Sequence, residues 1–431
     1  MIDRAGEINR VGLLLSVLVL VLAPASSESA AAGDLDPAFG GDGIVTTEFG
    51  NSMESASDVA IQVDGRLVVV GDIGLDRRDS RVGVARYDLD GALDPTFGGG
   101  DGKVVTDFTR RFDRGSGVAI QDDGKIVVAG AAGKRIGVAR YTATGELDPT
   151  FGGDGKVTTD LTRDRDYAWS VAIQETDDKI VVGGHAGGAG GRFAVARYET
   201  DGTLDPTFGG GDGWVATDLT SRYDVADDLA IQADGKIVAA GTADYFGGGF
   251  DARIALVRYN PNGTLDTGFS GDGRIKVGLG PGFDGAFAVA VQPDDQRIVV
   301  AGQAGHRLCV LRYDTAGVPD TTFSGNGVTV TDFTRGLDYA DEVLIQADDK
   351  IVAAGATNFY GRNAKFALAR YDSNGVLDPS FGGDGKVTTD ISTRRDGAYG
   401  LGIQPDGNLV AAGYARSPVD TRFALVRYVG A

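Results

Sequence analysis

The sequence predicts an all-β fold, a seven-bladed β-propeller built from four-stranded antiparallel blades. Three short signatures each occur seven times, in the same order, and together they cover residues 35–431. The phenylalanines of successive copies are 54 to 61 residues apart. Each copy holds four short stretches rich in Val, Ile, Ala and aromatic residues, separated by Asp/Gly turns. Repetition of a four-stranded unit at such a period is typical of a propeller.

The three signatures mark equivalent places in every copy. The first is Leu-Asp-Pro-Ala-Phe-Gly-Gly-Asp-Gly at 35–43, and it recurs with small variations around Phe97, Phe151, Phe208, Phe269, Phe323 and Phe381. The second is Ala-Ile-Gln, a turn and Leu-Val-Val-Val-Gly at 60–71, and its glutamine recurs at Gln121, Gln174, Gln232, Gln292, Gln346 and Gln404. The third ends in Arg-Tyr, with its tyrosine at Tyr87, Tyr141, Tyr198, Tyr259, Tyr313, Tyr371 and Tyr428.

The second copy illustrates the expected strands. They are predicted at residues 103–108, 117–121, 125–130 and 136–141. Asp-Gly between two apolar runs is a strong hairpin signal. Apolar residues show no helical period between these stretches. A β-solenoid is the alternative fold, although its coils are usually shorter and less hairpin-like.

Two of these motifs resemble a known family. Leu-Asp-Pro-Thr-Phe-Gly-Gly-Asp-Gly at 147–155 and Ala-Ile-Gln-Asp-Asp-Gly-Lys-Ile-Val-Val-Ala-Gly at 119–130 are similar to the delta-60 repeats of bacterial secreted propellers, whose blades are NHL-like. The resemblance extends over residues 35–431 and implies the fold. It implies no activity, substrate or catalytic residue.

Similar propellers place the Ala-Ile-Gln strand innermost in each blade. The Lys-Val-Val-Thr strand is then outermost, so the chain begins on an outer strand at 44–49. We expect this strand to complete the C-terminal blade, begun by residues 399–428, so that the ring closes and both sheet edges are covered.

The N-terminal segment has the order of a secretory signal. Arg4 and Arg10 precede a short apolar run at 11–22, and mostly small residues follow as far as Ala32. We therefore assign residues 1–33 to a signal peptide and short linker and residues 34–431 to one propeller domain. The expected location is secreted or extracytoplasmic.

Composition excludes several partners. The net charge of −20 disfavours binding to nucleic acid or to an anionic membrane surface. Later segments are not apolar enough for membrane insertion, and we expect a monomer. Cys309 is the single cysteine, so intrachain disulfides and thiolate metal clusters are excluded.

Length variation is confined to one loop of each repeat. The connectors before the Arg-Tyr strands contain 10, 5, 8, 12, 5, 10 and 9 residues. Subtracting the first six lengths from the Phe-to-Phe spacings leaves 48 or 49 residues every time. Variable loops on a rigid scaffold are where binding usually resides, so we expect the site on the face that bears them.

That face also carries an acid eight residues before each signature glutamine. The seven acids are Glu54, Asp113, Asp166, Asp224, Asp284, Asp338 and Asp396. One role is a ring at the mouth of the central channel that concentrates a cation such as Ca²⁺. The other, which neighbouring arginines favour, is in ion pairs and capped turns. No other cofactor is expected.

The residues five before each glutamine differ from copy to copy. The aromatic and acidic ones among them, with aromatics from the longer loops, form the predicted ligand site: Trp169, Asp227, Phe287, Asp341, Tyr399, Tyr245, Phe246 and Tyr360. An asymmetric mouth of this kind suits a glycan, a peptide or a protein segment.

Catalytic signatures are missing from the sequence. It holds no Gly-x-Ser-x-Gly elbow and no His-Glu-x-x-His motif, and its two histidines, His185 and His306, lie in non-adjacent copies and are expected to be exposed. The prediction is a binding or scaffold module without enzymatic activity. A calcium-assisted hydrolase or lactonase at the channel mouth, and a purely structural envelope or matrix component, are the alternatives.

Overall fold

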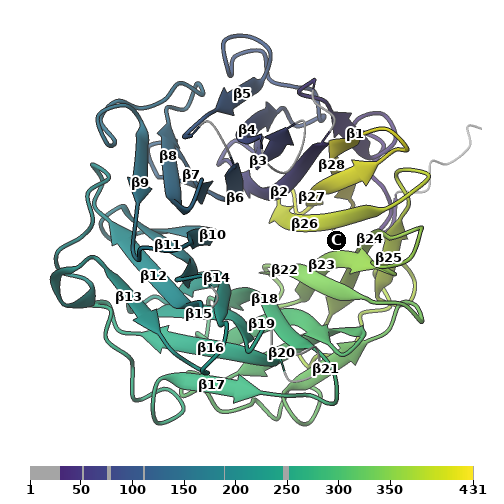
Figure 1. The fold of residues 1–431 in the computed structure, drawn as a ribbon. Helices are drawn as coiled ribbons and strands as arrows, with labels where there is room; N and C mark the ends of the chain where they lie inside the picture. The colour runs from purple at the N-terminus through teal and green to yellow at the C-terminus, as the bar shows by residue number, and fades with distance from the viewer. Residues whose placement is uncertain are drawn as a thin grey trace, which may run out of the picture.

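The fold consists of short antiparallel sheets set radially around a central axis (Figure 1). The computed structural model describes residues 30–50, 53–74, 79–109, 112–188, 190–245 and 252–430. Within these ranges the strands form five four-stranded sheets and one eight-stranded sheet. A 3₁₀ turn, η1 (Gly209–Gly211), is the one helical element there. The predicted all-β propeller fold with four-stranded antiparallel sheets is confirmed.

The strands fall into four classes by their place in a sheet, from the central axis outward. The innermost strands carry Ala-Ile-Gln or a variant: β2 (Met53–Ile61), β6 (Asp113–Ile120), β10 (Asp166–Gln174), β14 (Val225–Ile231), β18 (Asp284–Val291), β22 (Tyr339–Ile345) and β26 (Asp396–Ile403). The second strands are β3 (Leu67–Gly74), β7 (Ile126–Ala132), β11 (Lys179–Ala186), β15 (Ile237–Ala243), β19 (Ile298–Ala304), β23 (Ile351–Thr357) and β27 (Leu409–Arg416). The third strands end in Arg-Tyr: β4 (Ser80–Tyr87), β8 (Arg135–Tyr141), β12 (Arg192–Tyr198), β16 (Arg253–Tyr259), β20 (Arg307–Tyr313), β24 (Lys365–Tyr371) and β28 (Thr421–Tyr428). The outermost strands are β1 (Ile44–Thr47), β5 (Lys103–Thr106), β9 (Lys156–Thr159), β13 (Trp214–Thr217), β17 (Arg274–Val277), β21 (Val328–Thr331) and β25 (Lys386–Thr389).

The two ends of the chain meet in the eight-stranded sheet. Strand β1 pairs antiparallel with β28, with Ile44 opposite Val426. A single parallel bridge between Met53 and Thr421 joins β28 to β2. Successive innermost strands contact each other from β2 to β26, and β26 contacts β2. The purple and yellow ends of the chain therefore lie side by side (Figure 1).

The core lies between neighbouring sheets. One apolar cluster combines Ile254 and Leu256 of β16 with Ile298 and Val300 of the next sheet's β19. The second and third strands are buried on both faces because each sheet is covered by a neighbour on either side. This accounts for the nearly continuous apolar runs that replace simple alternation in the sequence.

The arginine of each Arg-Tyr pair joins two sheets. In every copy its guanidinium forms an ion pair of 2.6 to 3.0 Å with the aspartate of Leu-Asp-Pro or its variants. It also lies 4.4 to 5.0 Å from the centroid of the signature phenylalanine ring. A further N–H donates to a backbone carbonyl of the following sheet, as Arg312 does to Ser373 at 2.7 Å. The repeated Arg, Asp and Phe thus form one buried node per repeat.

The tyrosine of each pair reaches back to the preceding sheet. Six tyrosine hydroxyls lie 2.6 to 2.8 Å from a threonine Oγ1 at the end of the neighbouring outermost strand. The seventh tyrosine, Tyr313, is packed in a cluster with Val277, which stands where the other copies have threonine. One interface of the scaffold therefore lacks the hydroxyl that the others use.

We predict that Val277→Thr stabilises the protein. The new hydroxyl would supply the hydrogen bond to Tyr313 without a change of side-chain shape, which is worth about 0.5–1.5 kcal/mol. Urea unfolding should show this gain, and the reverse change at an existing pair, Thr331→Val, should show a loss of similar size. Equal stability of Val277→Thr and the native protein would contradict the assigned role of the Tyr–Thr pair.

Candidate functional site

Every innermost strand contains a β-bulge at the same position. The strand register skips one residue, for example between Ala226 and Asp228 of β14. The skipped residue is the one five before the signature glutamine in all seven strands: Ser57, Ser116, Trp169, Asp227, Phe287, Asp341 and Tyr399. A bulge takes its residue out of the ladder and re-aims the side chain. The bulge also explains why β6 begins at Asp113, four residues before the predicted start.

The glycine that follows the apolar run of each second strand makes room for the bulge. A Cβ atom at Gly241 would overlap the carbonyl oxygen of Val225, and the same collision recurs in the other sheets. Glycine is therefore required there by close approach of the bulged backbone. The repeated Val-x-x-Gly motif, in which x is Val, Ala or Gly, is a sequence signal of the bulge.

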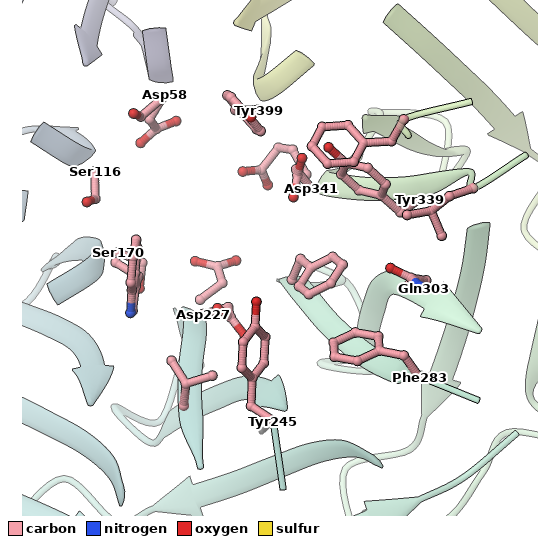
Figure 2. A pocket seen from close by; sticks show the side chains of 18 of the residues that line it. Asp58, Ser116, Ser170, Asp227, Tyr245, Phe283, Gln303, Tyr339, Asp341 and Tyr399 are labelled. Atoms are coloured by element: carbon pink, nitrogen blue, oxygen red, sulfur yellow. The ribbon is translucent and has the colours of Figure 1, made fainter. Parts of the chain in front are cut away.

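The seven bulge residues all line one cavity at the central axis. Its volume is about 1030 Å³, and it is built from all seven innermost strands and the loops beside them. Figure 2 shows Ser116, Asp227, Asp341 and Tyr399 around one open space. The structure thus brings together the predicted residues Trp169, Asp227, Phe287, Asp341 and Tyr399.

Two of the three predicted loop aromatics reach the same cavity. Tyr245 and Tyr360 line it, and both are exposed at their outer surface, by 40% and 75%. Phe246 lies outside the described residues. The cavity therefore opens on the face that carries the variable loops.

A chain of aromatic rings runs along one side of this opening, and all of its members except Tyr167 and His185 line the cavity. Ten rings follow one another at centroid distances of 5.0 to 6.5 Å, and we call this set the aromatic arc: Trp169, Tyr167, His185, Tyr223, Tyr245, Phe283, Phe287, Tyr339, Phe359 and Tyr360. They come from the sheets between β10 and β25. Strands β2 and β6 contribute small or polar bulge residues, so the cavity is asymmetric.

Acids dominate the charged lining. Sequence reasoning found Asp227 and Asp341 but missed Asp58, Asp228 and Glu342, which lie one residue after the bulge and also line the cavity. A sequence signal could have found them: two adjacent polar residues interrupt an otherwise apolar strand. In β14 and β22 both residues of the pair are acidic. The cationic side chain Arg114 lies 4.8 Å from the Trp169 ring and 3.3 Å from Asp72.

Two of these acids tie neighbouring innermost strands together. Asp58 accepts a hydrogen bond from the Val118 backbone N–H, and Asp228 accepts one from Val289 N–H, both at 2.8 Å. Burial nevertheless raises the pKa of Asp58 to about 6 and that of Asp228 to about 7. Their carboxyls therefore hold protons more tightly than a solvated aspartate.

The pKa values of the two bulge acids, Asp227 and Asp341, are raised further. Burial, and then the nearby carboxyl of Asp341, raises the pKa of Asp227 well above its usual range. Burial does the same to Asp341, against the opposing effect of a Tyr339 hydrogen bond. In the described part of the chain, the Oδ2 atoms of both acids and the Ser116 Oγ are buried without a hydrogen-bond partner. These are polar groups that the protein itself leaves unsatisfied.

The seven acids expected at the channel mouth have another role. All are fully or almost fully buried: Glu54, Asp113, Asp166, Asp224, Asp284, Asp338 and Asp396. Asp338 is typical, since it accepts the backbone N–H groups of Phe333, Thr334 and Asn358 at 2.8 to 2.9 Å. Equivalent loop N–H groups bind the other six carboxylates.

These hydrogen bonds support the role of the seven acids in capped turns, and the cation ring stays a prediction. The acid oxygens are directed at loop amides, which a cation would have to displace. Among the described residues, no group of three or more His, Cys, Asp or Glu side chains is placed to hold a metal ion. The alternative of capped turns describes these seven acids.

The two histidines differ from each other: His306 is exposed, as expected, whereas His185 is not. His185 is 3% exposed rather than solvated, and its Nδ1 accepts a hydrogen bond from Trp169 Nε1 at 3.2 Å. Burial lowers its pKa to about 4. His185 also lines a smaller cavity of about 530 Å³ that shares Trp169 and Tyr223 with the central one. His306 lines the central cavity.

Comparison with known proteins supports the propeller. Six segments match the model of a family described as a domain of unknown function (DUF5122) beta-propeller, at 62–97, 121–151, 175–208, 232–269, 292–323 and 346–381. These six segments are similar to the repeats of that propeller family and support a propeller fold. No curated protein matches the sequence significantly. In the described ranges no helix is long and apolar enough to cross a membrane.

Solved structures share the fold at low identity. A catalytically inactive virginiamycin B lyase from Staphylococcus aureus with quinupristin has a TM-score of 0.53 and 11% identity, over 89% of this chain and 98% of that one. The hydrazine synthase of Kuenenia stuttgartiensis has a TM-score of 0.50 and 13% identity, over 85% and 96%. These likenesses establish the fold alone.

The loop acids yield a stability prediction. Asp338→Ala should lower the free energy of unfolding by roughly 2–4 kcal/mol, because several buried loop amides lose their acceptor. Thermal melting of the native protein should be unchanged by millimolar Ca²⁺. Glu146→Ala, at an exposed position on the opposite face, is the control and should change neither property. A calcium-dependent rise in melting temperature that Asp338→Ala abolishes would support the metal ring.

The raised pKa of Asp58 predicts a pH effect. The folded protein keeps this proton up to about pH 6, whereas the unfolded chain releases it near 3.8. Between these values the folded state binds more protons, so stability falls as pH rises, by up to roughly 3 kcal/mol. Asp58→Asn retains an acceptor for Val118 N–H but lacks this ionisation.

The measurement is urea unfolding of both proteins between pH 4.5 and 7.5. The native protein should lose stability relative to Asp58→Asn across this range. Parallel stability profiles for the two proteins would show that burial does not perturb this carboxyl.

Proposed function

We propose that this protein is a secreted binding module whose ligand, a glycan, a peptide or a segment of a protein, occupies the central cavity. The observation that carries the proposal is the set of seven bulges. They project side chains of different chemistry into one cavity while the rest of each repeat stays nearly constant. A purely structural role would not require an asymmetric cavity whose aromatic and acidic residues are concentrated at the bulge positions.

The proposed scaffold is a closed ring of seven blades related to the delta-60 repeats. Strand β1 completes the blade of β26, β27 and β28 by pairing with β28. Tyr87 bonds to Thr47 of β1, and Arg427 donates to the Leu89 carbonyl, so both kinds of contact also occur across the junction of the chain ends. The signatures of this seventh blade come from both ends of the chain: residues 35–43 supply the first and residues 404–428 the other two.

Binding is preferred to catalysis. The calcium-assisted hydrolase would have used the seven loop acids, whose oxygens instead bind loop amides. The bulge carboxyls of Asp227 and Asp341 share the cavity with aromatic rings such as those of Phe287 and Tyr245. We propose a monomer that acts outside the cytoplasm after removal of the N-terminal signal.

Intrinsic fluorescence gives a direct test. The chain has two tryptophans, Trp169 in the cavity and Trp214 on the outermost strand β13. A Trp214→Phe variant therefore reports on the cavity alone. We expect members of a glycan and peptide library to shift the Trp169 emission and to raise the melting temperature.

The matched control keeps Trp214 and replaces Trp169 by Phe. A true cavity ligand should still raise the melting temperature of this variant but leave its emission unchanged. If no glycan or peptide alters either signal in the Trp214→Phe variant, the binding role is wrong and an architectural role remains.

A further inference from the structure

We propose that the central cavity binds an organic cation, a ligand whose protonated amine lies between the Asp227 and Asp341 carboxylates and against the aromatic arc. This inference rests on the proposed binding function and narrows it to a ligand class. The structure favours a cation through the charge of the lining, through its unsatisfied polar atoms and through its aromatic surface.

The charge of the lining is the first argument. Five acids border the cavity, at the bulge or directly after it: Asp58, Asp227, Asp228, Asp341 and Glu342. Among the lining residues that the structure describes, Arg114 and His306 are the basic ones. The Arg114 guanidinium already lies beside Asp72 and over Trp169. The lining therefore has an excess of acid that a cationic ligand would offset.

Unsatisfied polar atoms are the second argument. Asp227 Oδ2 and Asp341 Oδ2 are buried without a hydrogen-bond partner among the described residues. Ser116, which is 8% exposed, has an unpartnered Oγ in the same cavity. Figure 2 shows these three side chains directed toward one open space. An ammonium group has three N–H donors and matches this set of acceptors.

Asp227 and Asp341 would repel each other when both are ionised. Each carboxyl belongs to a bulge, and the strand between them, β18, contributes the Phe287 ring rather than a cation. Their mutual effect helps to raise the pKa of Asp227. A positive group between the two carboxyls would convert this repulsion into two attractions.

The aromatic arc argues for an organic rather than an inorganic cation. Faces of Tyr and Phe rings attract alkylammonium and guanidinium groups, and they also bury the carbon skeleton to which such groups are attached. The volume of about 1030 Å³ exceeds the space of a coordinated metal ion and lies in the range of small-molecule sites. Carboxylates separated by rings do not form the oxygen cage that Ca²⁺ needs.

The amine has two possible sources, a free polyamine or a lysine side chain in a peptide. Both present an ammonium group on a flexible apolar chain, so the cavity chemistry is the same. Spermidine and the tripeptide Gly-Lys-Gly are suitable probes for them. The same tripeptide with an acetylated lysine is the neutral counterpart, and maltotriose tests for a glycan.

The experiment is a titration of these probes against the Trp214→Phe protein, followed by Trp169 fluorescence and calorimetry. We expect spermidine or the tripeptide to bind, and acetylation to weaken tripeptide binding by about tenfold or more, because charge-assisted hydrogen bonds are lost. Spermidine binding alone would identify a free polyamine, and tripeptide binding would identify a peptide side chain.

Charge-neutral variants test the assigned carboxyls. Asp227→Asn and Asp341→Asn should each weaken amine binding by about tenfold. Glu146→Gln removes the same charge from an exposed site on the opposite face and should leave affinity within about twofold of the native value. Tyr245→Leu alters an aromatic side chain that is 40% exposed, so it should fold and should weaken amines more than neutral probes.

Three results would overturn the inference. Equal binding of the acetylated and free tripeptides would remove the cation requirement, and so would native amine affinity in both Asn variants. If calcium competes with the amine, and if Asp227→Asn no longer binds calcium, the ligand class would be an inorganic rather than an organic cation. If maltotriose binds and the amines do not, the cation inference fails while the binding function stands; if no probe binds, both fail.

Discussion

The buried arginine of each Arg-Tyr pair is the interaction on which the rest of the structure depends. A guanidinium that is 1% to 5% exposed is costly to bury unless every N–H group has a partner. Here its partners are an aspartate from the same repeat, a phenylalanine ring and a backbone carbonyl from the next sheet. Misplacing one sheet by a single residue would leave this charge unpaired, so the node sets the register between neighbours as well as contributing stability.

The nodes join neighbouring sheets at the face opposite the variable loops. The residues at the central axis are therefore not needed for these contacts. The second and third strands of each sheet are buried on both faces, so substitutions in them disturb the packing of the core. The bulge residues escape this constraint because they leave the strand ladder. Serine, tryptophan, aspartate, phenylalanine and tyrosine all occupy the same bulge position, above the same glycine of the adjacent strand. The scaffold therefore separates the residues that fold the chain from those that give the cavity its chemistry.

Sequence reasoning predicted much of this, because the repeat spacing aligns equivalent residues without a structure. The spacing from the signature glutamine was sufficient to select Trp169, Asp227, Phe287, Asp341 and Tyr399, all of which line the cavity. It also grouped the seven loop acids, but it could not show which atoms their carboxylates face. For Asp338 the sequence left a metal ligand and a turn cap as alternatives, and in three dimensions its carboxylate accepts loop N–H groups. His185 was expected in solvent because it lies in a variable-length connector, whereas the Tyr167 and Tyr223 rings lie against it.

Two sets of buried acids on one face show how surroundings divide a single residue type into two roles. The loop acids accept hydrogen bonds from backbone N–H groups, so their buried oxygens have partners within the protein. Asp227 and Asp341 line the central cavity together with aromatic rings, and each retains a buried, unpartnered oxygen. Burying such a group reduces stability in the absence of a partner. A chain built only for rigidity would gain by replacing both acids with apolar residues of the same size, as Phe287 does at the equivalent position between them. A ligand that forms hydrogen bonds to these unpartnered oxygens would remove the energetic cost of burying them. The positions where the cavity lining destabilises the folded protein are therefore also positions suited to binding.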